Sequence, residues 1–118
     1  AIKNYLTPIE NLELLFSGDD LNVAFEWLNK FGLFHVQDEL TASLSFGQQK
    51  KLALIRVLAQ SSDLLILDEP FVGLDQATAD QLNSFLAQKI SQNAGLILTS
   101  HITPMIDCAV LDLGAKNA

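Results

Sequence analysis

The sequence predicts an α/β protein with parallel strands, preceded by a helical segment. Two short apolar runs, at 64–67 and 96–99, are separated by an amphipathic helical pattern over residues 76–91. A strand, a helix and a second strand in this order indicate a right-handed crossover between parallel strands of one sheet. Ahead of them, residues 7–31 repeat apolar positions at helical spacing, which predicts a helical hairpin.

The hairpin has recognisable ends. Thr7 followed by Pro8 and Glu10 is typical of a capped helix start, and Ser17-Gly18 breaks the first helix. Asp19 or Asp20 is expected to cap the second helix, which Gly32 ends. The apolar stripes of the two helices are Ile9, Leu12, Leu15 and Phe16, and then Leu21, Ala24, Phe25, Leu28 and Phe31.

A third helix is expected to start at Ser45 and to run through Arg56 to about Gln60. Ser45 can cap it, and Gln48 stands three residues later, as in a capping box. The same helix start has free backbone N–H groups and the positive end of the helix dipole, which suit an anion. Gly47 would allow a phosphate to approach the backbone closely. The capping and the anion-binding interpretations are compatible.

The run Leu64–Leu67 is continuous and apolar, which is typical of a buried parallel strand. Asp68 and Glu69 follow it directly, while His101 follows the run at 96–99. Ligands of open parallel sheets bind beyond the carboxyl ends of the strands, so these side chains are expected to converge there. Residues 110–113 are expected to form a further strand.

Three side-chain chemistries would then meet at one sheet edge. An Asp can hold Mg²⁺, a Glu can orient or deprotonate a water, and a His can donate a hydrogen bond to a phosphate oxygen. A structural interpretation is also open for each residue. Asp68-Glu69-Pro70 can be only a turn that stops the strand, and a single His such as His101 is more often structural than catalytic.

Composition narrows the function classes. The chain has 118 residues, 49% of them hydrophobic, and a net charge of −7. The seven Lys and Arg residues form no long cluster, so nucleic-acid binding is not expected. The sequence has no apolar run of membrane-spanning length and no signal-like start, which favours a cytoplasmic location. The single cysteine, Cys108, lies in an apolar run and is expected to be a small buried hydrophobe.

At this point the motifs resemble those of ABC ATPases. Leu44-Ser45-Phe46-Gly47-Gln48-Gln49 resembles the LSGGQ signature, and residues 64–70 resemble a Walker B strand followed by the catalytic glutamate. Gly73-Leu74-Asp75 is similar to the D-loop, and Thr99-Ser100-His101 to the switch histidine. Each motif is weak alone, but the four in this order are specific. Residues 6–12 also resemble the start of the family's helical subdomain.

The resemblance implies a partial P-loop NTPase fold, with a helical subdomain segment over 1–43 and the ATPase core over 44–118. It implies ATP and Mg²⁺ as cofactors, with Asp68 positioning the metal, Glu69 polarising the attacking water and His101 contacting the γ-phosphate. Residues Ser45, Phe46, Gly47 and Gln48 would close on ATP held by a second ATPase subunit in a head-to-tail dimer, and Asp75 would lie at that interface.

The resemblance also implies a transmembrane permease subunit as partner and a peripheral place on the inner face of the cell membrane. Within the family, the compact layout looks most like the ATP-binding subunit of the haem exporter of cytochrome c maturation. Two alternatives stay open: a soluble ABC ATPase, and a non-catalytic interaction domain of the same fold.

The sequence departs from the family pattern twice. Phe46 replaces the usual small residue of the signature, which is expected to reduce function without abolishing it. The phosphate-binding pattern G-x-x-x-x-G-K-S/T does not occur in the 118 residues. The simplest expectation is a fragment cut after the phosphate-binding part, inactive by itself and prone to self-association; a naturally degraded relative is the alternative.

Overall fold

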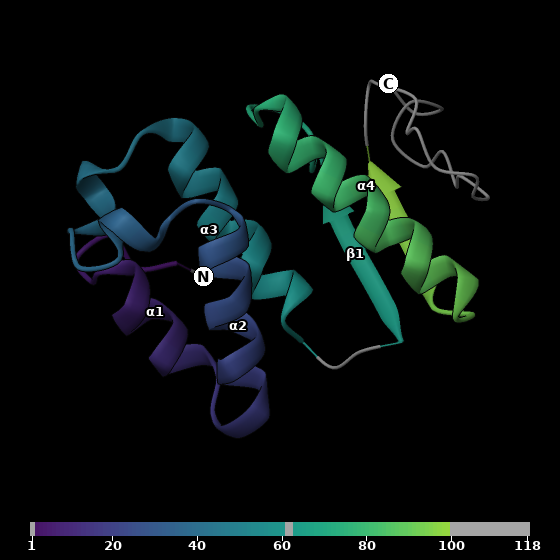
Figure 1. Ribbon diagram of the computed structural model, residues 1–118, viewed down its shortest axis with the longest axis horizontal. Coiled ribbons are helices and arrows are strands. Elements are labelled where there is room, and N and C mark those ends of the chain that lie inside the picture. Colours follow the sequence, from purple (N-terminus) through teal and green to yellow (C-terminus); the bar gives the residue numbers. More distant parts are fainter. Residues whose placement is uncertain (1, 61–62, 100–118) are drawn as a thin grey trace. The chain divides into compact units, whose positions relative to one another are not determined.

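The computed structural model describes residues 2–60 and 63–99 (Figure 1). The chain divides into two compact units, Ala1–Ser61 and Ser62–Ala118. The division falls after the helix that starts at Ser45, so that helix folds with the helical elements before it. The sequence-based boundary at residue 44 divides the helical subdomain segment from the part that carries the ATPase motifs, and it stays a prediction.

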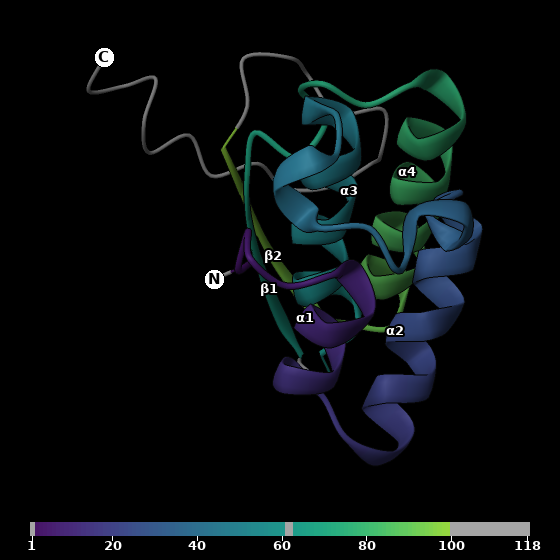
Figure 2. The same ribbon diagram turned by 90° about the vertical axis from the view of Figure 1, so that its left-hand side faces the viewer.

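The first unit is helical. It contains α1 (Pro8–Leu15), α2 (Gly18–Lys30) and α3 (Phe46–Leu58), with two short 3-10 turns, η1 (Phe34–Val36) and η2 (Thr41–Ser43), between α2 and α3. Helices α1, α2 and α3 all contact one another, as Figures 1 and 2 show. Their shared core is made of fully buried apolar side chains, among them Leu12, Ala24, Leu28, Phe31, Leu33, Leu52 and Ile55.

Local sequence signals place most helix ends correctly. At α1, the Thr7 hydroxyl accepts from the Glu10 amide at 3.1 Å and the Glu10 carboxylate accepts from the Thr7 amide at 2.9 Å, which confirms the expected capping box. Gly32 has a φ of +74°, a conformation that favours glycine and that ends α2 as expected.

The expected cap of α2 is wrong. Helix α2 begins two or three residues earlier than expected, at Gly18, and its N-cap is Ser17, whose side chain makes no capping hydrogen bond. Asp19 and Asp20 therefore lie inside the first turn. There their negative charges still stabilise the helix, because they face the positive end of the helix dipole.

The second unit consists of β1 (Leu64–Asp68), α4 (Gln76–Ser91) and β2 (Gly95–Thr99). The strands are parallel and in register, from the Leu64–Gly95 pair to the Asp68–Thr99 pair. This confirms the strand–helix–strand order read from the sequence. Leu82 and Leu86 are the fully buried apolar residues of α4, which contacts β2. The expected strand at 110–113, His101 and Cys108 lie outside the described residues.

Burial of β1 alternates instead of being continuous. Leu65 and Leu67 are buried, whereas Leu64 is 49% and Ile66 is 62% exposed. The expectation of a strand buried on both faces is therefore wrong for this chain. Because parallel sheets are normally covered on both faces, the exposed pair is an apolar surface that supports the expected self-association, which stays a prediction. No helix among the described residues is long and apolar enough to cross a membrane.

Candidate functional site

The start of α3 is a capped helix end with backbone amides directed outward. The Ser45 hydroxyl accepts from the Gln48 amide at 3.1 Å, and the Gln48 side-chain oxygen accepts from the Ser45 amide at 2.9 Å. This confirms the predicted capping box. The amides of Phe46 and Gly47 lie in the first turn, where a helix offers no intrahelical acceptor. We call residues 45–48 the signature turn; it has the elements of an anion site.

Phe46 is the first residue of α3 and its side chain is 70% exposed. The ring is therefore not part of the core of the helical unit. Any effect of Phe46 on function must come from its contacts with a ligand or with another protein. The expectation that Phe46 reduces function without abolishing it stays a prediction.

The end of β1 carries two consecutive carboxylates. Asp68 is the last residue of the strand, is exposed, and pairs in register with Thr99. Glu69 follows it with a φ of +47° and is half-buried. A residue before proline is normally extended, and a non-glycine residue rarely adopts positive φ. Residues held in such a conformation are concentrated at functional sites, so Glu69 is a strong candidate.

The surroundings of Glu69 fix this turn. Pro70 is buried, and the Glu69 carbonyl accepts from the Val72 amide at 3.3 Å. The backbone thus turns at Glu69, directly after the end of β1. No local signal in the sequence indicates the positive φ, because a residue before proline favours an extended conformation.

Asp75 has a structural role that the sequence comparison of motifs did not suggest. It is the N-cap of α4, and its carboxylate accepts from the Thr78 amide at 2.9 Å. Gly73, with a φ of +80°, shapes the loop ahead of it. Capping does not preclude a contact with another subunit, since Asp75 is exposed. Its place at a subunit interface stays a prediction.

The donor set at the end of β1 fits Mg²⁺. Mg²⁺ keeps several waters and is bound by one or two carboxylates together with phosphate oxygens, rather than by a cage of protein ligands. Asp68 and Glu69 supply two consecutive carboxylates at the end of β1, and Asp68 is exposed. The arrangement suits a metal that arrives with a phosphate ligand.

The structure thus assembles two candidate groups, each within one unit. Ser45, Phe46, Gly47 and Gln48 share one helical turn, and Asp68 and Glu69 share one strand end, with Asp75 at the start of the next helix. The third expected participant of the strand-end group, His101, lies outside the described residues.

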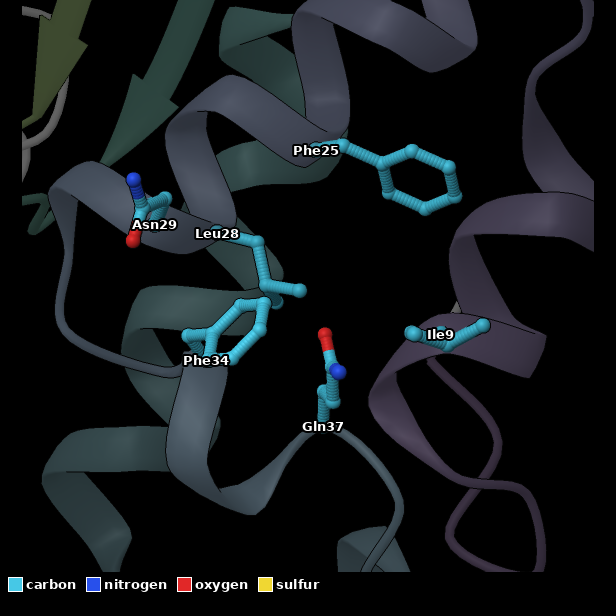
Figure 3. Close-up of a pocket in the computed structure, with 6 residues that line it drawn as sticks. All are labelled: Ile9, Phe25, Leu28, Asn29, Phe34 and Gln37. Atoms are coloured by element: carbon cyan, nitrogen blue, oxygen red, sulfur yellow. The ribbon is translucent and has the colours of Figure 1, made fainter.

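A further feature of the helical unit is an apolar pocket of about 470 Å³ that the sequence did not predict (Figure 3). In Figure 3, Leu28 and Phe34 lie side by side, and the Gln37 side chain reaches up between Phe34 and Ile9. The Gln37 carbonyl accepts from the Ile9 amide at 3.3 Å, which joins the two walls. The lining residues come from α1, α2, η1 and the segment after it: Ile9, Phe25, Leu28, Asn29, Phe34 and Gln37.

Comparison with known proteins agrees with these motifs. A family model described as ABC transporter matches residues 2–72. Among curated relatives, the cytochrome c biogenesis ATP-binding export protein CcmA of Idiomarina loihiensis is 38% identical over 104 residues, covering 86% of this chain and 47% of the relative. The Escherichia coli K12 protein of the same name is 38% identical over 101 residues, covering 86% of this chain and 49% of the relative. The chain therefore spans about half the length of the curated relatives it matches.

Solved structures agree as well. The ATP binding subunit of an ABC transporter is 26% identical with a TM-score of 0.77, covering 86% of this chain and 45% of that one. A dimeric ATP-binding cassette in a post-hydrolysis state, bound to ADP and Pi, is 25% identical with a TM-score of 0.70, covering 86% of this chain and 48% of that one.

Proposed function

Because the chain belongs to the ABC transporter family, we propose that it forms the signature and Walker B part of an ATP-hydrolysing transporter subunit. We further propose that the transporter serves cytochrome c biogenesis and exports haem, since the relatives named above are ATP-binding export proteins of that process. The subunit would act at the inner face of the cell membrane.

The observation that carries the proposal is the conformation of Glu69. A half-buried carboxylate held at positive φ, directly after a strand-end aspartate, suits a group that must point at one reacting molecule. Asp68 would hold Mg²⁺, which would neutralise charge on the phosphates of ATP. Glu69 would accept a hydrogen bond from the attacking water and orient it toward the γ-phosphate.

The signature turn is proposed to act on the nucleotide of a second subunit. Its outward amides and the dipole of the 13-residue helix α3 favour a negatively charged ligand. The dimeric cassette bound to ADP and Pi supports a dimer as the working unit, and we propose a head-to-tail arrangement of its two subunits. Asp75, exposed at the start of α4, is proposed to lie at that interface.

The experiment that tests the proposal is Mg²⁺-dependent ATP hydrolysis by the complete gene product together with its permease. Hydrolysis that depends on Mg²⁺ and on protein concentration would support it. ATP-independent binding to the permease, with no turnover at any concentration, would instead favour a non-catalytic interaction domain.

The apolar pocket is proposed as the surface that meets the permease. Phe34 lines the pocket and is 61% exposed, so its ring is accessible to a partner protein. Residues 1–40 carry seven Asp or Glu side chains and two Lys side chains. Cytoplasmic loops of membrane proteins are rich in Lys and Arg. We therefore expect the permease to insert an apolar side chain into this pocket and to place basic residues beside the acidic surface around it.

Replacing Phe34 by Ala should weaken association with the permease by roughly tenfold or more, because aromatic anchors in pockets dominate interface energies. ATP binding should not change. The control is Leu14→Ala: Leu14 is also an exposed apolar residue of this unit, at 64%, but does not line the pocket. Co-purification and titration by light scattering measure the effect, and equal losses for both variants would count against the pocket.

A further inference from the structure

A partly buried hydrogen-bond network joins the first residues of the chain to the signature turn. At its centre is Asn11, a polar side chain that is almost completely buried. Its oxygen accepts from the Lys3 amide at 2.7 Å. Its nitrogen lies 3.0 Å from the Lys3 carbonyl, 3.0 Å from the Thr7 carbonyl and 3.1 Å from the Thr41 hydroxyl. Asn11 thus links the segment before α1 to the segment before α3.

The link continues from Thr41 to α3. Thr41 is fully buried, and its amide donates to the Leu6 carbonyl at 2.9 Å. The Gln49 side-chain nitrogen, on the first turns of α3, donates to the Thr41 carbonyl at 3.0 Å and to the Leu44 carbonyl at 3.3 Å. The segment 41–44 is therefore held at Thr41 by both Asn11 and Gln49, and at Leu44 by Gln49. Ser45, the cap of α3, follows them directly.

We propose that Asn11, Thr41 and Gln49 are positioning residues that hold the signature turn in the orientation its ligand requires. This inference rests on the proposed function, because it assumes that the signature turn binds the nucleotide of a second subunit. None of the three residues need touch that nucleotide. They fix the carbonyls and the backbone that lead into Ser45, so that the amides of Phe46 and Gly47 point in one direction before the ligand arrives.

The connectivity explains why a polar network is used here. Backbone hydrogen bonds tie Thr41 to Leu6 and Ala42 to Asn4 and close the short turn through Leu44. The side chains of Asn11 and Gln49 add bonds that join this turn to α1 and to α3. Buried hydrogen bonds have directional geometry and leave costly unpaired groups when they break, so they specify one arrangement. Misplacement of binding groups by about 1 Å is enough to reduce catalysis strongly.

Thr41→Val tests the network with little damage to the fold. Valine keeps the branched shape but removes the hydroxyl, while Asn11 still has the carbonyls of Lys3 and Thr7 as acceptors. Thr41→Ser restores the hydroxyl. Gln49→Met removes the other end of the network. The matched control is Ser43→Ala, which deletes an exposed hydroxyl of the same short turn, bonded only locally to the Leu40 carbonyl.

The measurement is made on the complete gene product carrying Glu69→Gln, which should retain bound ATP. Thr41→Val and Gln49→Met should weaken ATP-driven dimerisation roughly five- to tenfold, with nucleotide binding by the single subunit unchanged. Thr41→Ser and Ser43→Ala should dimerise like the parent. Hydrogen exchange of the single subunit should show faster exchange of the amides of residues 45–49 in Thr41→Val, but not of the Asn11 amide in α1.

Three results would overturn the proposal. The first is unchanged exchange at residues 45–49 in Thr41→Val, which needs no nucleotide and so tests the network apart from the proposed function. The second is unchanged dimerisation of Thr41→Val and Gln49→Met when the parent dimerises. The third is a parent that forms no ATP-dependent dimer, which would remove the proposed function and this inference with it.

Discussion

Replacing Glu69 by Gln in the complete gene product should lower ATP turnover by at least about 100-fold, the usual contribution of a positioned general base. The amide keeps the size of the side chain and its place in the turn after β1. It cannot accept the proton of the attacking water, and it carries no charge to orient that water. ATP binding should persist, because Asp68 and the phosphate-binding groups are unchanged.

Steady-state hydrolysis and nucleotide binding measured side by side check this expectation. The control is Glu26→Gln, which makes the same change on an exposed residue of α2 and should leave turnover unchanged. Turnover of Glu69→Gln within threefold of the parent would remove Glu69 from the assigned role. The positive φ of this residue would then need a purely structural explanation.

Replacing Ser45 by Asp should abolish ATP-driven dimerisation while leaving the helical unit as stable as before. Aspartate is as good an N-cap as serine, so α3 should still start at Phe46. Its charge would face the phosphates of the partner's nucleotide. Two like unit charges about 4 Å apart repel by roughly 4 kcal/mol at an effective dielectric constant near 20, which is about three decades in affinity.

The structure supplies a matched control for this charge change. Thr7 caps α1 with the same reciprocal hydrogen bonds that Ser45 makes at α3. Thr7→Asp should therefore alter net charge and capping equally but leave dimerisation unchanged. Sedimentation with and without ATP, together with thermal unfolding, separates the two effects. Loss of dimerisation in both variants, or in neither, would contradict the role given to the signature turn.

Local sequence signals predicted the parts of the fold that local chemistry controls. The caps at Thr7 and Ser45, the stop at Gly32 and the strand–helix–strand order all follow from residue types within a few positions. The start of α2 differs from the expectation because Gly18 adopts a positive φ. This conformation lets the helix begin directly after Ser17, ahead of the two aspartates that were expected to cap it. Alternative caps next to one another differ by little free energy, so sequence alone does not choose among them.

Features that depend on distant residues could not be predicted. The exposure of Leu64 and Ile66 depends on which face α4 covers, and a continuous apolar run does not encode this. The burial of Asn11 depends on Thr41, thirty residues away. The positive φ of Glu69 opposes the local preference and is held by the surrounding turn. The sequence therefore predicts which residue types form the candidate site. It does not predict the geometry of these residues or the contacts that support them.

The most direct test of the account is a mixing experiment with the two variants above. In a head-to-tail dimer, each site pairs Glu69 of one subunit with the signature turn of the other. A mixed dimer of Glu69→Gln and Ser45→Asp would then hold one doubly altered site and one intact site. An equal mixture of the two inactive proteins should recover activity, to at most about one quarter of the parent's, because the charge at the doubly altered site also weakens the mixed dimer. No recovery, with mixed dimers shown to form, would contradict a signature turn that acts on the partner's nucleotide.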